Sequence, residues 1–136
     1  MMRLRKIVTG RWTVACEVDD RGNAAVFNEL SALWSNRSTK GVAAGFRAQF
    51  TQIPPQGPTY LPDVIYHCVD PANGIYEFIK GRYRILCFAV EGRVVVCSTV
   101  FLKQTRKTPD AEKNRAIDLK RRYLAAVAGS AIEWVD

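Results

Sequence analysis

The sequence predicts a single α+β domain, with strand-like and helical segments in separate blocks along the chain. Residues 12–18 alternate between apolar and polar side chains, as half-buried strands do. Residues 26–53 carry two apolar patterns of helical period, and residues 75–102 carry strand-like runs separated by turns. Because blocks of strands and helices follow one another, an α+β fold is expected. The 136 residues suit one domain that buries its core without a metal ion or a disulfide.

The N-terminal half is expected to form a strand and a helix pair. Residues 1–11 precede the strand and read as a basic N-terminal extension. Apolar side chains recur at helical spacing over residues 26–34 and again over residues 42–53. Residues 35–38 break the pattern, and so short a connection favours an antiparallel helix pair. The proline-rich residues 54–58 end the second helix.

Strands dominate the next part of the chain. Residues 64–69 form either a short strand or an extended loop. Residues 75–79 and 83–90 are two further expected strands. A Glu-Gly pair then makes a tight turn into residues 93–102, so the last two strands are expected to form a β-hairpin within an antiparallel sheet.

A C-terminal helix is expected to complete the single domain of residues 1–136. Thr108 suits the N-cap of this helix, and Pro109 suits its first position. The apolar face of the helix runs to Gly129, where a glycine is a natural stop. Residues 129–136 then remain as a C-terminal tail.

The composition argues against several classes of protein. The chain has no apolar run long enough to cross a membrane, and no membrane partner is expected. None of the four cysteines forms a CxxC pair, and there is one histidine, so no metal site is expected. Three of the cysteines lie in apolar strand-like runs, which is typical of reduced core cysteines in a cytoplasmic protein.

The charge is unevenly distributed along the chain. The formal net charge of +7 points to an anionic partner. Seven basic residues and one acidic residue lie between Lys80 and Lys107. Their concentration on strands and turns favours a phosphate-binding face, and a merely solvated surface is the alternative.

Four segments carry a resemblance to a known family. They are residues 74–79 (GIYEFI), 83–86 (YRIL), 94–96 (VVV) and 101–109 (FLKQTRKTP). Together they resemble the RelE/HigB-like toxins of bacterial type II toxin–antitoxin systems, in particular the phage-derived HigB-type branch. The resemblance covers roughly residues 12–125, and the last segment is its most specific part.

The resemblance implies a compact RelE-like fold and a ribosome-dependent endoribonuclease, an mRNA interferase that inhibits translation. In that reaction the 2′-hydroxyl attacks the adjacent phosphate, with no metal and no cofactor. Cations stabilise the negative charge of the phosphorane, and a further group moves protons. The implied partners are mRNA, the ribosome and a cognate antitoxin of helix-turn-helix type.

The resemblance and the charge pattern nominate two sets of residues. The catalytic candidates are Arg84, Lys103, Lys107 and Arg82. The candidates for RNA contact are Lys80, Arg106, Tyr83 and Tyr123. Arginine can hold two phosphate oxygens with its planar guanidinium, lysine acts as a point charge, and an aromatic ring can stack on a base.

These assignments have competing interpretations. Arg84 can instead pair with Glu77 or Glu91. Tyr123 can pack in the core, because it lies at helical spacing with the apolar face of the last helix. The one histidine, His67, is a minor candidate for the general base.

One position departs from the family pattern. The family usually has an arginine two residues after the glutamate that corresponds to Glu77, where this chain has Ile79. Lys80 or Arg82 would then supply the charge, and Gln104 stands where a second lysine is common. The alternative function is therefore a non-catalytic module on the same fold, a degraded prophage toxin that binds RNA, the ribosome or an antitoxin. A DNA-binding accessory protein is a less favoured third interpretation.

Overall fold

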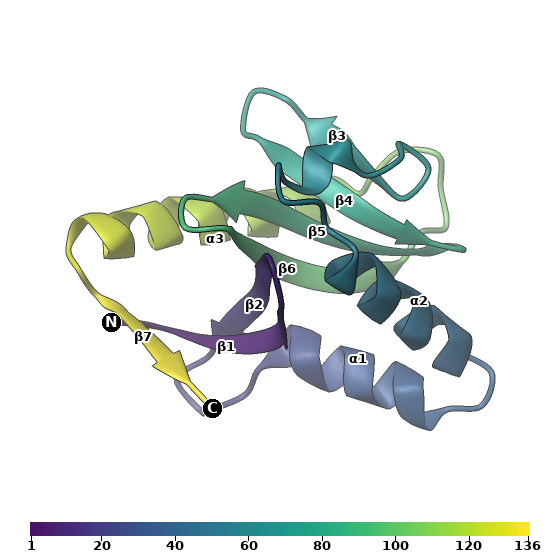
Figure 1. Cartoon of the computed structure of the whole chain (residues 1–136), viewed down its shortest axis with the longest axis horizontal. Coiled ribbons are helices and arrows are strands. Elements are labelled where there is room, and N and C mark those ends of the chain that lie inside the picture. The colour runs from purple at the N-terminus through teal and green to yellow at the C-terminus, as the bar shows by residue number, and fades with distance from the viewer.

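The computed structural model describes all 136 residues and has an α+β architecture, as the sequence predicts (Figure 1). Seven strands form one sheet, and three α-helices cover it. The elements in chain order are β1 (Met2–Thr9), β2 (Thr13–Val18), α1 (Ala25–Ser35), α2 (Lys40–Thr51), the 3₁₀ turn η1 (Pro58–Tyr60), β3 (Tyr66–Asp70), β4 (Ile75–Lys80), β5 (Tyr83–Val90), β6 (Val94–Leu102), α3 (Asp110–Ala128) and β7 (Ile132–Val135). None of the helices is long and apolar enough to cross a membrane.

The sheet is mostly antiparallel, with the strand order β3-β4-β5-β6-β2-β1-β7. The strands β3 to β6 form a continuous antiparallel meander, and β1 and β2 form an antiparallel hairpin. Two parallel pairs complete it, since β2 lies beside β6 and β7 lies beside β1. The β2–β6 pair joins the N-terminal hairpin to the meander, so the chain has a single sheet.

The helices divide the core into two layers, one on each face of the sheet (Figure 1). The helix-pair core lies under α1 and α2, where Phe46 and Phe50 pack against strand residues such as Phe78. The α3 core lies on the other face, where Leu119 and Tyr123 are buried with apolar side chains of four strands. The predicted helix pair and the predicted last helix are therefore both confirmed.

The two ends of the chain differ from the expectation. Residues 1–11 are not an extension, because residues 2–9 form β1 between β2 and β7. Leu4 of β1 is completely buried in the α3 core. Residues 132–135, expected in a tail, form β7. Basic side chains alternate with apolar ones over residues 2–5 of β1. A strand can bury its apolar side chains on one face while long basic side chains keep their charged ends in solvent on the other face.

The start of α3 also differs in detail. The helix begins at Asp110, with Pro109 at the N-cap position, and no side chain caps it. Thr108 is buried instead of capping the helix. Glu112 in the first turn accepts a hydrogen bond of 2.6 Å from Thr99 Oγ1 of β6, which fixes the helix start against the sheet.

All four cysteines are free thiols, and three of them are buried. Cys16, Cys97 and Cys87 occupy neighbouring positions of β2, β6 and β5 in the helix-pair core. Burial raises the pKa of each of these three thiols, because the thiolate would lose its hydration. Cys68 of β3 is only partly buried.

We expect Cys68 to react with a thiol reagent at least about tenfold faster than the other three cysteines in the folded protein, because thiolate access controls the rate. A time course with an aromatic disulfide reagent should therefore show one fast thiol and three slow ones. Cys68→Ser should remove the fast phase alone. Four thiols reacting at one rate in the folded protein would contradict the packing of the three buried cysteines.

Candidate functional site

Two basic segments meet at one end of the sheet. The turn between β4 and β5 and the loop between β6 and α3 both lie at the right-hand end of the molecule in Figure 1. The register of the β5–β6 hairpin places Tyr83 opposite Leu102 and Arg84 opposite Phe101. Beyond that pairing, the backbone N–H of Lys103 donates a hydrogen bond of 2.7 Å to the carbonyl oxygen of Arg82. The sheet thus holds the loop against the turn.

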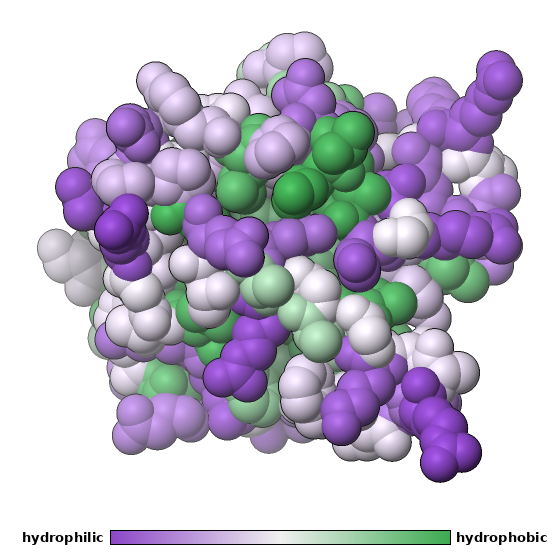
Figure 2. Space-filling view, turned by 45° about the vertical axis from the view of Figure 1, so that its right-hand side comes forward, coloured by the Kyte–Doolittle hydropathy of each residue, from purple (hydrophilic) through white to green (hydrophobic).

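This end gathers five of the predicted residues, which we call the basic end. They are Lys80, Arg82, Lys103, Arg106 and Lys107. Four of them make no salt bridge within the chain, and Lys107 Nζ lies 3.7 Å from Asp110 Oδ1. All except the half-buried Lys103 are exposed. Figure 2 turns this side toward the viewer and shows long hydrophilic side chains standing out along its right-hand margin.

The side chain of Lys80 lies on the helix-pair face of the turn. A Cβ placed on Gly45 of α2 would come within 2.5 Å of the Lys80 Cε, so the lysine stem runs across this glycine. Arg82 instead lies in the turn itself, next to Lys103. Of the two residues expected to replace the arginine missing at Ile79, Arg82 therefore has the closer link to the β6–α3 loop.

Arg84 is held differently from the cations of the basic end. Its side chain is only 16% exposed, and its Nη1 donates hydrogen bonds to the carbonyl oxygens of Gly81 (2.8 Å) and Tyr83 (2.9 Å). Its Nε lies 3.6 Å from Glu77 Oε1. The guanidinium is therefore folded back onto the β4–β5 turn, and the pairing with Glu77 is the one named above as the alternative.

Glu77 is the most unusual charged residue of the chain, because its side chain is completely buried. The β3–β4 register places His67 opposite it, and His67 Nε2 lies 2.9 Å from Glu77 Oε1. Neither carboxylate oxygen accepts a hydrogen bond of normal geometry, so the nearby Arg84 guanidinium stabilises the carboxylate mainly by its proximity. Burying an unpaired carboxylate is costly. Glu77, His67 and Arg84 thus form one cluster of titratable side chains beside the basic end.

The sequence suggests Glu77 only as a possible partner of Arg84, and His67 only as a minor candidate for the general base. The available signal was a carboxylate inside an apolar strand, at a position whose neighbours two residues away face a core. The contact of this carboxylate with His67 could not be predicted from the sequence, because the β3–β4 register brings His67 there from ten residues earlier.

We expect Arg84→Ala to destabilise the fold by about 3–5 kcal/mol, because it removes one partner of a buried charged pair. It also frees the carbonyl oxygens of Gly81 and Tyr83. Adding Glu77→Gln to the same chain should recover part of the loss, because the buried charge is then gone. Chemical denaturation of the two single variants and the double variant measures this coupling, and strictly additive effects would contradict the pairing.

The two tyrosine candidates lie apart from the basic cations. Tyr83 is half-buried and packs against the helix-pair core, on the sheet face opposite Arg84. Tyr123 is 8% exposed in the α3 core, and its ring meets Phe88 edge-on with the centroids 5.9 Å apart. Burial raises the pKa of the Tyr123 hydroxyl. The position of Tyr123 agrees with the packing interpretation given above.

The two best-formed grooves of the surface contain no residue of the basic end. One groove of about 430 Å³ lies between β1, α1 and α2. A second, of about 470 Å³, lies along α3 and is lined mainly by polar side chains of α3, β2 and β6. Four of the five cations of the basic end are exposed, so they form an open surface. An open surface of cations suits an extended anionic polymer better than a small ligand, which would need enclosure.

The protein is a small α+β domain with cations concentrated at one end of its sheet. Such a concentration of positive charge is typical of a protein that binds an anionic partner. The family model described as "Phage derived protein Gp49-like (DUF891)" matches residues 34–121, which run from the end of α1 into α3. The chain therefore belongs to this Gp49-like, phage-derived family, a toxin-like family of toxin–antitoxin systems, and the family implies an antitoxin partner. No curated protein matches the chain.

Proposed function

We propose that this protein is the toxin of a toxin–antitoxin system and acts in the cytoplasm as a ribosome-dependent mRNA endoribonuclease of the RelE/HigB class. The observation that carries the proposal is the basic end, where four cations without salt bridges surround the joined β4–β5 turn and β6–α3 loop. All of these residues lie inside the segment that matches the family. The short motifs of the same segment add the resemblance to RelE/HigB toxins.

The proposed reaction needs charge stabilisation and two proton transfers. The 2′-oxygen of the RNA forms a bond to the adjacent phosphorus, the bond from phosphorus to the 5′-oxygen breaks, and a 2′,3′-cyclic phosphate and a 5′-hydroxyl result. One group takes the proton of the 2′-hydroxyl, and another gives a proton to the leaving 5′-oxygen. Arg82, Lys103 and Lys107 are the proposed cations that stabilise the phosphorane, with Arg106 and Lys80 on the flanking phosphates.

Arg84 enters this proposal in one of two roles. If its guanidinium leaves the carbonyl oxygens of the turn, it can hold the scissile phosphate with the other cations. If it stays, it is a positioning residue that keeps Arg82 and Lys103 in place by closing the turn. His67 is the candidate for proton transfer, because it is 41% exposed and its ring is held by the buried Glu77.

Induction of the protein in a bacterium should arrest growth within one generation and leave mRNA cut inside codons on translating ribosomes. Primer extension on a reporter mRNA, with and without an antibiotic that empties ribosomes of mRNA, measures the cleavage and its dependence on translation. Unimpaired growth, together with intact mRNA in cells that contain the folded protein, would refute the nuclease proposal.

A non-catalytic binding module is the second candidate, and one observation favours it. Arg84 is engaged by Glu77 and by two carbonyl oxygens, while Ile79, directly opposite it in the β4–β5 register, replaces the arginine common in the family. Such a module should bind ribosomes without cutting mRNA. Co-sedimentation with ribosomes in the absence of any cleavage product would favour this candidate over the toxin.

A further inference from the structure

An apolar groove lies between β1 and the helix pair, and none of the five residues of the basic end lines it. Its apolar lining is formed by Ile7 and Val8 of β1, by Phe27, Leu30 and Trp34 of α1, and by Phe50 of α2. Its volume is about 430 Å³. The two β1 residues and two of the three α1 residues precede the segment that matches the family, so much of this groove belongs to the chain's own N-terminal part.

One wall of the groove follows the axis of α1. Phe27, Leu30 and Trp34 recur at helical spacing, so the wall that α1 contributes runs over about two turns, or roughly 10 Å. Trp34 is 44% exposed, although it is a large apolar side chain. Small side chains, such as Ser31 and Ala43, line the groove between the larger ones and leave it open. An amphipathic helix fits such a groove with side chains at positions i, i+3 or i+4, and i+7.

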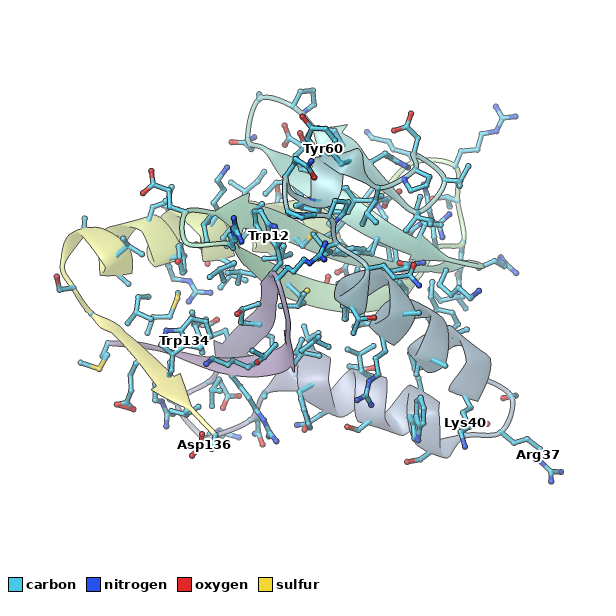
Figure 3. The ribbon with its side chains drawn as sticks, in the orientation of Figure 1. Trp12, Arg37, Lys40, Tyr60, Trp134 and Asp136 are labelled. Atoms are coloured by element: carbon cyan, nitrogen blue, oxygen red, sulfur yellow. The ribbon has the colours of Figure 1, made fainter.

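Cations surround this groove. The Arg5 guanidinium lies 3.7 Å from the centre of the Phe27 ring, and Lys40 Nζ lies 5.1 Å from the centre of the Trp34 ring. Arg47 lines the groove itself. Figure 3 shows Lys40 near the α1–α2 connection, with Arg37 projecting from the same end of the helix pair.

None of these cations has a carboxylate partner in the chain. The salt bridges of the molecule join other residues, mainly along α3, as between Arg121 and Asp118. Between residues 22 and 62 the one acidic residue is Glu29. It lies two positions after Phe27, which places it about 200° around α1, away from the groove. The groove therefore combines an apolar floor with unpaired positive charge at its edge.

We propose that this groove docks an acidic amphipathic helix of a partner protein. Apolar side chains of that helix enter between α1 and β1, and its carboxylates meet Arg5, Lys40 and Arg47. A second copy of this chain is a poor occupant, because a symmetric contact would bring the same cations together. An antitoxin is the partner that the family implies, and this identification of the helix rests on the proposed function. The docking itself does not depend on RNA cleavage.

Two designed helical peptides of about 18 residues test the proposal, both with leucine at the i, i+3, i+4 and i+7 positions. One carries glutamate at the remaining positions, and the other carries lysine. Titration calorimetry at low salt should show the acidic peptide binding the full-length protein at least about 100-fold more tightly than the basic peptide, and high salt should weaken it. Trp34→Ala and Arg47→Glu should each weaken the acidic peptide at least about tenfold, while Arg121→Glu on α3 should not.

Several outcomes would overturn the proposal. The two peptides could bind equally, neither could bind, or the groove variants could have no effect. A dimer in solution that Trp34→Ala dissociates would make a second copy the occupant. Displacement of the acidic peptide by an RNA oligonucleotide would assign the groove to RNA. Wild-type protein that binds the acidic peptide but never cuts mRNA would refute only the proposed function. If the proposed function holds, the Arg47→Glu variant should cut mRNA as the wild type does.

Discussion

Replacing Arg82 and Lys103 together by alanine is expected to reduce cleavage of ribosome-bound mRNA by at least about 100-fold, because each substitution removes a cation that we propose stabilises the phosphorane. The fold should survive. The two residues are joined by their backbones, through the 2.7 Å hydrogen bond from the Lys103 N–H to the Arg82 carbonyl oxygen, and alanine keeps that bond. Primer extension on translating ribosomes measures the cleavage, and thermal unfolding followed by circular dichroism checks the fold.

The matched control removes two positive charges from another surface. Arg115 and Arg121 of α3 are 63% and 71% exposed and pair with carboxylates within their own helix. The double alanine variant at these positions changes the net charge equally and should keep nearly full activity. If both double variants lose activity to the same degree, the net charge of the protein and not the basic end governs the reaction. Full activity of the Arg82 and Lys103 double variant would mean that these two residues do not take part in the reaction.

Shortening Leu4 to alanine is expected to destabilise the protein by about 2–5 kcal/mol, because Leu4 is completely buried and its loss leaves a cavity in the α3 core. Deleting residues 1–11 should prevent folding altogether. That deletion removes β1 and leaves β2 without one neighbour and β7 without its only partner. Denaturant unfolding of the point variant and circular dichroism of the truncated chain measure the two effects.

Lys6→Ala is the control for this prediction. Lys6 lies in the same strand, but its side chain is exposed and its Nζ lies 5.5 Å from the centre of the Trp134 ring. A loss of no more than about 1 kcal/mol is expected, the scale of an exposed cation–π contact. A folded, cooperatively melting protein without residues 1–11 would mean that these residues are an extension after all.

The middle of the chain could be predicted because its signals are local. Local patterns locate α1, α2, β4, β5, β6 and α3 to within a few residues, because each element has apolar side chains at regular spacing on the face that packs in a core. The two ends could not be predicted in the same way. The alternation in β1 covers only residues 2–5 before Lys6 interrupts it, and the four-residue β7 has too short a pattern to be recognised. β7 is a strand because it pairs with β1, at positions separated by almost the whole chain, and β1 pairs with β2 as well.

The candidate site, too, could be predicted from the sequence only in part. Its cations could be listed from the charge distribution, and the turn and loop that carry them could be located from the hairpin pattern. Their meeting depends on a tertiary hydrogen bond between Lys103 and Arg82. The cluster of Glu77, His67 and Arg84 depends on the register of three strands, and register is set by packing and turns throughout the sheet.

The sequence by itself determined the α+β class, the helix pair, the hairpin and the concentration of charge between Lys80 and Lys107, because these follow from local periodicity and composition. Tertiary structure decided which charged side chains are exposed and unpaired and which are held by contacts within the fold. It tied Arg84 to the turn, buried Glu77 beside it, and placed Tyr123 in the α3 core. It also placed β1 beside the helix pair and so made a groove with unpaired cations. The physical reason is that pairing and burial depend on which distant segments the sheet brings together.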